Sequence, residues 1–133
     1  MPAVVVDTHA IVWYLFGDAR LSLRAADALD SATAAGELIH VPSICLVELT
    51  YLVEKGRLPA IARRRLVQAL DDPGTRCLLA PLDRKIADAL GSVSRSEVPD
   101  LPDRIVAATA VALGAPPISR DAKIRASRIQ TIW

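Results

Sequence analysis

Four acidic residues stand where a carboxylate could do chemistry as well as carry charge. Asp7 ends a buried-looking run of three valines, Glu48 lies inside an apolar helical stretch, and Asp103 and Asp121 each open a predicted helix. Carboxylate oxygens, without a cluster of histidines or cysteines, suit a hard divalent cation such as Mg²⁺ or Mn²⁺. If the fold brings these side chains together, the sequence predicts a metal site.

Glu48 is the least conventional of the four. The residues three and four positions away on its predicted helix are apolar or aromatic, namely Ile44, Cys45, Tyr51 and Leu52. An unpaired buried carboxylate costs several kcal/mol, so Glu48 must be paired, protonated or bound to a cation. A structural salt bridge is the plainer alternative, but no lysine or arginine lies at helical spacing to form one.

A structural role is also open for each aspartate taken alone. Asp7 and Asp121 can cap the helices that follow them, and Asp103 can favour a helix N-terminus through the helix dipole. His9 and His40 form no recognisable arrangement with a nucleophilic serine or cysteine. Only the combination of the four acids points to chemistry.

The elements that must position these acids alternate between strands and helices. Strands are expected at 4–6, 37–41, 75–79, 116–119 and 129–132, and helices at 10–16, 21–35, 43–55, 59–71, 83–93, 103–114 and 121–127, with a surface loop at 94–102. Crossovers of this length predict one α/β domain over residues 1–133, with a mostly parallel sheet of four to five strands between helical layers. The strand order cannot be read from periodicity.

A parallel sheet would gather the acids at one edge. Asp7 and Asp121 would follow the carboxyl ends of strands, and Asp103 would lie at a helix N-terminus on the same side. Glu48 would project into the same crevice. Without a cation, four crowded carboxylates would repel one another and some would take up protons.

The composition excludes several classes of protein. The 133 residues carry 16 basic and 15 acidic side chains, a net charge of +1, which argues against a general polyanion-binding surface but not against a local basic patch. No apolar run is long enough to span a membrane and no secretory signal is evident, so a cytoplasmic protein is expected. The glycine-rich phosphate-binding, dinucleotide-binding and serine-hydrolase motifs are absent.

Together these motifs resemble the PIN-domain family and, within it, the VapC-type toxins of toxin–antitoxin pairs. The segments that carry the resemblance are 5–10, 42–49, 55–58, 103–110 and 119–121, with the final Trp133. Four acidic motifs in the right order and at the right separations make the match specific. It runs nearly from end to end and implies a three-layer α/β/α PIN-like fold.

The resemblance also implies an activity. By this resemblance, the protein is expected to be a Mg²⁺-dependent endoribonuclease, the toxin of a type II toxin–antitoxin system. Such an enzyme cleaves RNA phosphodiesters with a metal-activated water, and Mn²⁺ is expected to substitute for Mg²⁺. The resemblance further implies a homodimer and a cognate VapB-type antitoxin that inserts a segment near the acidic crevice. Carried over, the acidic site is Asp7, Glu48, Asp103 and Asp121, with Thr8 and Ser119 as hydroxyl support. The family often reads D-P-x-D-R here, whereas in this chain Leu101 follows Asp100 and the proline is Pro102. Because of this shift, we interpret Asp100 as a loop acid or an outer acid of the site.

Basic residues near these motifs are candidates to contact RNA phosphates or acids of the antitoxin: Arg57, Arg104, Arg120, Lys123 and Arg125. Two other functions are compatible with the sheet. One is a phosphate-handling domain: a haloacid-dehalogenase-like phosphatase would need a second Asp two residues after Asp7, where this chain has His9. A receiver would need adjacent acids on its first strand and a late lysine, and neither is evident. A non-catalytic binding module, with the acids as helix caps, is the other.

Overall fold

A parallel sheet of four strands forms the middle layer of the protein in the computed structural model, which describes residues 3–133. The strand order is β3-β2-β1-β4, and every neighbouring pair is parallel. Val5 of β1 is paired with His40 of β2 on one side and with Pro117 of β4 on the other. Three consecutive valines suit β1 because a central strand is covered on both faces, and all three are buried.

The elements follow one another in an alternating order. The strands are β1 (Val4–Val6), β2 (Ile39–Pro42), β3 (Cys77–Ala80) and β4 (Pro117–Ile118); the α-helices are α1 (Thr8–Phe16), α2 (Leu23–Ala34), α3 (Ser43–Glu54), α4 (Ala60–Asp71), α5 (Arg84–Ala89), α6 (Leu101–Leu113) and α7 (Ala122–Ala126); the 3₁₀ turns are η1 (Pro73–Thr75) and η2 (Leu90–Ser92).

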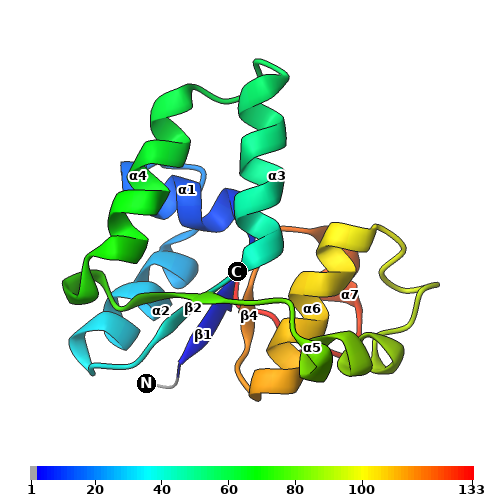
Figure 1. The fold of residues 1–133 in the computed structure, drawn as a ribbon. Coiled ribbons are helices and arrows are strands. Elements are labelled where there is room, and N and C mark those ends of the chain that lie inside the picture. Colours follow the sequence, from blue (N-terminus) through cyan, green and yellow to red (C-terminus); the bar gives the residue numbers. More distant parts are fainter. Residues whose placement is uncertain (1–2) are drawn as a thin grey trace.

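Helices cover both faces of the sheet. Figure 1 shows α1 to α4 on one side of the strands and α5 to α7 on the other. This division follows from the connections: the chain steps from β1 to β2 to β3 in one direction, then returns across the sheet to β4. Because parallel crossovers are right-handed, reversing the direction moves the helices to the opposite face. The expected three-layer α/β/α fold is therefore confirmed.

Two apolar clusters hold the layers together. The larger one packs Ile11, Leu29, Leu49 and Leu66 of the first helical layer against the strands. The smaller cluster lies between α5, α6 and α7. Alanines of α6 are almost fully buried at 107, 108 and 110, and their small side chains let this helix approach its neighbours closely.

Several element boundaries differ from those expected. The helix expected at 103–114 begins at Leu101, because the side chain of Asp100 caps it. The helix expected at 83–93 ends at Ala89 and continues as η2. The strand expected at 129–132 is reduced to a single bridge between Ile132 and Ile118, because the two-residue β4 offers little to pair with. Among the described residues, no helix has the length and apolar character needed to cross a bilayer.

Candidate active site

The predicted acids lie where the connections of the sheet change direction. β1 is followed by a crossover to β2, whereas its other neighbour, β4, is reached from β3 across the opposite face. The helices after β1 and β4 therefore leave on different sides, which opens a crevice at the carboxyl ends of these two strands. Ligands of open α/β sheets bind at such switch points. Asp7 directly follows β1, and Ser119 directly follows β4.

Ser119 connects two of the acids. Its side chain is fully buried, and its hydroxyl donates a hydrogen bond of 2.5 Å to Oδ2 of Asp7. The hydroxyl oxygen of Ser119 in turn accepts a hydrogen bond of 3.0 Å from the backbone N–H of Asp121. The other carboxylate oxygen of Asp7 accepts from the N–H of Ala10 and caps α1. Asp7 and Asp121, which are 114 positions apart, are thus held beside the same hydroxyl.

Glu48 reaches the site from the second turn of α3. Its Oε1 accepts a hydrogen bond of 2.5 Å from the hydroxyl of Thr8, the first residue of α1. Thr8 is 2% exposed, so its hydroxyl has little access to water. The contact ties α3 to the residue next to Asp7. The prediction that Glu48 faces a cleft agrees with this position, although Tyr51, on the same predicted stripe, is exposed.

Asp103 and Asp100 come from the start of α6. Asp100 is the N-cap residue, and its side chain accepts a hydrogen bond of 3.1 Å from the N–H of Asp103. Asp103 lies in the first turn, where the helix dipole favours a negative charge. The order Asp-Leu-Pro-Asp thus places two carboxylates on one helix terminus.

One pocket of about 320 Å³ receives all these side chains. Five acids line it: Asp7, Glu48, Asp100, Asp103 and Asp121. His9, Trp13, Val106 and Arg120 complete the lining. The four predicted acids, scattered over more than a hundred positions, therefore face a common space, with Thr8 and Ser119 supporting two of them.

Burial and mutual repulsion make this pocket costly for negative charge. Burial raises the pKa of Asp7 above its ordinary value, and hydrogen bonds from Ser119 and Ala10 only partly oppose it. The pKa of Asp103 is raised to about 7, first by burial and then by the neighbouring carboxylates, that of Asp121 above all. The only ion pairs within residues 3–133 are Arg20–Asp18 and Arg84–Asp88. None of the five pocket acids is therefore neutralised by a basic side chain of the described chain.

The pocket offers the kind of ligand that a divalent cation prefers, but its carboxylates are not gathered in the arrangement that would coordinate one. Within residues 3–133, no group of three or more His, Cys, Asp or Glu side chains is already arranged to hold a metal ion. The pocket nevertheless offers carboxylate oxygens, which Mg²⁺ and Mn²⁺ prefer. A cation would also offset the repulsion that raises the pKa of Asp103. The residues present thus match the chemistry of the group, and binding would require the carboxylates to draw together.

The predicted basic contacts fall into two kinds. Arg104 donates hydrogen bonds to the carbonyls of Val93 (2.9 Å) and Leu90 (3.0 Å), so its guanidinium anchors both ends of the η2 turn to α6. The other predicted contacts, Arg57, Arg120, Lys123 and Arg125, are exposed. Of all five, only Arg120 lines the pocket of acids.

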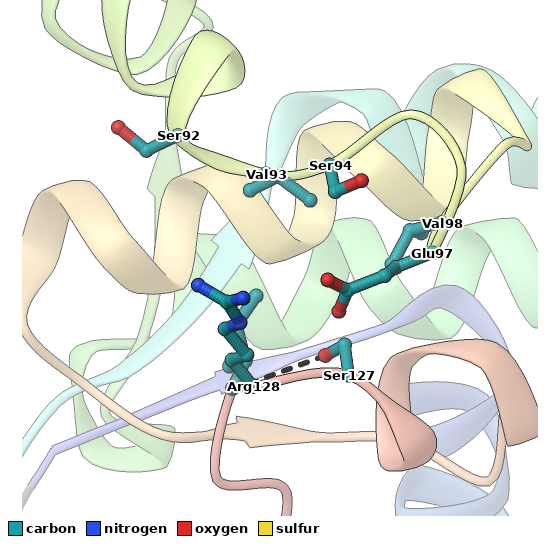
Figure 2. A pocket seen from close by; sticks show the side chains of 8 residues that line it. Ser92, Val93, Ser94, Glu97, Val98, Ser127 and Arg128 are labelled. Carbon is teal, nitrogen blue, oxygen red and sulfur yellow. Dashed lines mark hydrogen bonds between the residues drawn. The ribbon is translucent and has the colours of Figure 1, made fainter.

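A second pocket lies apart from these acids. It encloses about 220 Å³ between residues 92–98 and 127–129, and Figure 2 shows Glu97 and Arg128 among its side chains. None of the five acids lines it. Glu97 is the only carboxylate among the residues that line it, so the metal site predicted from the sequence corresponds to the first pocket.

His9, Trp13 and Val106 line the first pocket but were not predicted as site residues from the sequence. His9 and Trp13 follow Asp7 at two and six positions and reach the pocket from the first turns of α1. The interpretation of Asp100 as a loop or outer acid misses its capping role, although its place three residues before Asp103 is the N-cap spacing. That spacing was the available signal for Asp100. Nothing in the sequence alone separated Trp13 from an ordinary core residue.

Comparison with known proteins agrees with this fold. The family model of the PIN domain matches residues 4–129. The chain is 29% identical over 137 aligned positions to a protein of Mycobacterium tuberculosis (strain ATCC 25618 / H37Rv) called Ribonuclease VapC22, and the match spans the whole of both chains.

Two solved structures share the fold. One is VapBC2 from Rickettsia felis bound to a DNA fragment from its promoter, with a TM-score of 0.68, 20% identity and coverage of 98% of this chain and 94% of that one. The other is a toxin–antitoxin complex from Klebsiella pneumoniae, with a TM-score of 0.64, 24% identity and coverage of 94% and 92%. At these identities the likeness concerns the fold.

Proposed function

Because this chain belongs to the PIN-domain family, we propose that it is a metal-dependent endoribonuclease of the VapC type, the toxin of a type II toxin–antitoxin pair. The observation that carries the proposal is the pocket of five carboxylates without a basic partner. The full-length relative called a ribonuclease supports the substrate class. The two toxin–antitoxin complexes with the same fold support the biological setting.

Asp7, Glu48, Asp103 and Asp121 are the residues proposed to hold Mg²⁺, with Mn²⁺ as a substitute. When bound, the ion would supply the Lewis acidity that polarises a phosphodiester and lowers the pKa of an attacking water. The donor chemistry of the pocket supports this assignment, and the charge of the ion would relieve the crowding of the carboxylates.

The chain's own side chains set the geometry for the reaction. Thr8 holds one oxygen of Glu48, which leaves the other oxygen of that carboxylate free to face the pocket. Both oxygens of Asp7 accept a hydrogen bond, one from Ser119 and one from Ala10, so a ligand would use their remaining lone pairs. In an in-line hydrolysis, one of these carboxylates orients the attacking water. This reaction needs no histidine base, and it leaves a 5′-phosphate on one product and a 3′-hydroxyl on the other.

The partners follow from the same proposal. Arg57, Arg120, Lys123 and Arg125 are exposed and are proposed to contact RNA phosphates or the acids of a VapB-type antitoxin. Arg104 contributes indirectly, because its guanidinium is engaged with backbone carbonyls. A homodimer acting on RNA in the cytoplasm completes the proposal.

Cleavage of end-labelled RNA tests the function. Wild-type protein is incubated with the RNA with and without Mg²⁺, beside Asp7→Asn, and the ends of the products are mapped. Cleavage should require Mg²⁺, should leave 5′-phosphates, and should fall at least about 100-fold in the variant because a proposed metal ligand is lost. Asp7→Asn should fold normally, since burial already disfavours the charge of Asp7. Products with 2′,3′-cyclic phosphates, or cleavage unaffected by the substitution, would reject this chemistry.

A further inference from the structure

Arg120 is the one arginine or lysine in the lining of the acid pocket. It stands between Ser119, whose hydroxyl is bonded to Asp7, and Asp121, whose side chain caps α7. The backbone is therefore fixed on both sides of Arg120, while its own side chain is exposed. The hydrogen bonds of Ser119 and Asp121 thus fix where Arg120 lies, and its guanidinium charge remains accessible to a ligand.

The guanidinium of Arg120 lies against an aromatic ring. Its central carbon is 4.7 Å from the ring centroid of Trp13, within the range of a cation–π interaction. Trp13 is only 4% exposed, and its ring also packs against Trp133 with a centroid distance of 6.0 Å. Arg120 thus rests on a rigid support.

A second arginine on the same ring makes the contrast clear. Arg20 lies 5.2 Å from the centroid of Trp13 but forms an ion pair of 2.8 Å with Asp18. Arg120 forms no ion pair within residues 3–133, although five carboxylates line the same pocket. The π face of Trp13 holds this cation beside the acids without neutralising it.

We propose that Arg120, supported by Trp13, is a substrate-binding residue that holds a phosphate of single-stranded RNA at the acid pocket. This inference rests on the proposed function and names the residue that makes the acidic site attractive to a polyanion. A guanidinium can donate two parallel hydrogen bonds to the non-bridging oxygens of one phosphate. Five nearby carboxylates would otherwise repel the same group.

The test measures RNA binding as a function of salt. Fluorescence anisotropy of a labelled single-stranded RNA is recorded at fixed Mg²⁺ in the Asp7→Asn background, so that the RNA stays intact. Arg120→Gln should weaken binding about tenfold and should lower the slope of log Kd against log salt by about 0.7, the value for one phosphate contact on a single strand. Arg120→Lys should keep the slope, because the charge remains, and should weaken binding less.

Arg64→Gln is the matched control. Arg64 is exposed on α4 and lines none of the pockets described above, and the substitution removes the same charge. The control should leave both Kd and the slope near those of the background protein. Melting curves for each variant establish that it is folded; if Arg120→Gln does not fold, the comparison rests on Arg120→Lys, whose weakened binding at unchanged slope is the expected result.

Four outcomes would overturn the proposal. Equal effects of Arg120→Gln and Arg64→Gln would assign Arg120 to general surface charge. Unchanged RNA binding, with weakened binding of an acidic protein partner, would assign it to that partner. If wild-type protein neither binds nor cuts RNA, the proposed function and this inference both fail; if RNA is cut but Arg120→Gln binds it normally, only the inference fails.

Discussion

The two carboxylate oxygens of Asp7 have different hydrogen-bond partners. One oxygen caps α1 through the N–H of Ala10, and the other accepts the hydroxyl of Ser119. Asp121 likewise caps α7 through one oxygen and also lines the pocket. Asp7 and Asp121 therefore do act as helix caps, but capping uses only one carboxylate oxygen of each side chain. Capping and metal binding are compatible roles for these residues.

Asp103 gives a prediction about stability in the absence of metal. Its pKa of about 7 in the folded protein lies above the ordinary value of 3.8, so the folded state binds the extra proton. Stability without metal should therefore fall as the pH rises from about 4 through about 7. Asp103→Asn removes the charge and should raise Tm at pH 8 by roughly 3–6 °C, with little change near pH 4.

Thermal melts in EDTA at the two pH values measure this difference. Asp88→Asn is the control, because Asp88 is exposed on α5 and lies outside the acid pocket. A Tm gain for Asp103→Asn that is the same at both pH values would show that repulsion among the pocket carboxylates is not its cause.

Thr8 gives a second prediction at this scale. Thr8→Val keeps the shape of the side chain but removes the hydroxyl that holds Glu48. The loss should cost about 1–2 kcal/mol of unfolding free energy and should reduce kcat/KM for RNA cleavage roughly tenfold. Urea unfolding and cleavage kinetics measure the two effects. Thr8→Ser restores the hydroxyl and should recover most of both; equal losses in Thr8→Ser would mean that packing, and not the hydrogen bond, is responsible.

At the scale of elements, the start of α6 is the clearest difference from the sequence-based expectation. The helix begins at Leu101 because Asp100, and not a residue nearer Asp103, supplies the cap. A proline in the first turn is compatible with this arrangement, since its missing N–H would have no helical partner there. The cap places Asp100 at the pocket, where its charge adds to the repulsion on Asp103.

Two substitutions of Asp100 separate its cap from its charge. Asp100→Ala removes both and should lower the unfolding free energy by about 1 kcal/mol. Asp100→Asn retains a capping side chain and should match or exceed the wild-type stability at pH 8, because one of the carboxylates facing Asp103 is gone. Urea denaturation at pH 8 compares them. Equal destabilisation in both variants would contradict the capping role.

Local patterns predicted the alternation of elements and the acids that end or begin them. The valine run of β1 and the glutamate within an apolar stripe each have a short-range physical cause, and both could be read directly. Strand order could not be predicted, because pairing of β1 with β4 joins residues more than a hundred positions apart. The Trp13–Arg120 contact depends on that pairing, since it brings α1 beside the end of β4. The sequence therefore indicated Arg120 as a candidate contact residue, but it could not predict that the guanidinium would lie against the ring of Trp13.

At the scale of the whole molecule, the switch in helix direction between β1 and β4 explains why the acids converge. Asp7 and Asp121 follow these strands, α3 brings Glu48 from one helical layer, and α6 brings Asp103 from the other. Both helical layers and the sheet thus contribute to one pocket. A fold with the same elements but without this crevice would leave the four carboxylates as separate helix caps and surface charges.

Anomalous diffraction from crystals grown with Mn²⁺ shows whether the pocket carboxylates bind a divalent cation. We expect a manganese peak in the acid pocket, ligated by oxygens from Asp7 and at least one of Glu48, Asp103 and Asp121, with the carboxylates closer together than in the metal-free arrangement. The peak should disappear in Asp7→Asn crystals grown in the same way. A wild-type map without a peak in this pocket at saturating Mn²⁺, or with manganese bound only elsewhere, would show that the four acids do not form a metal site.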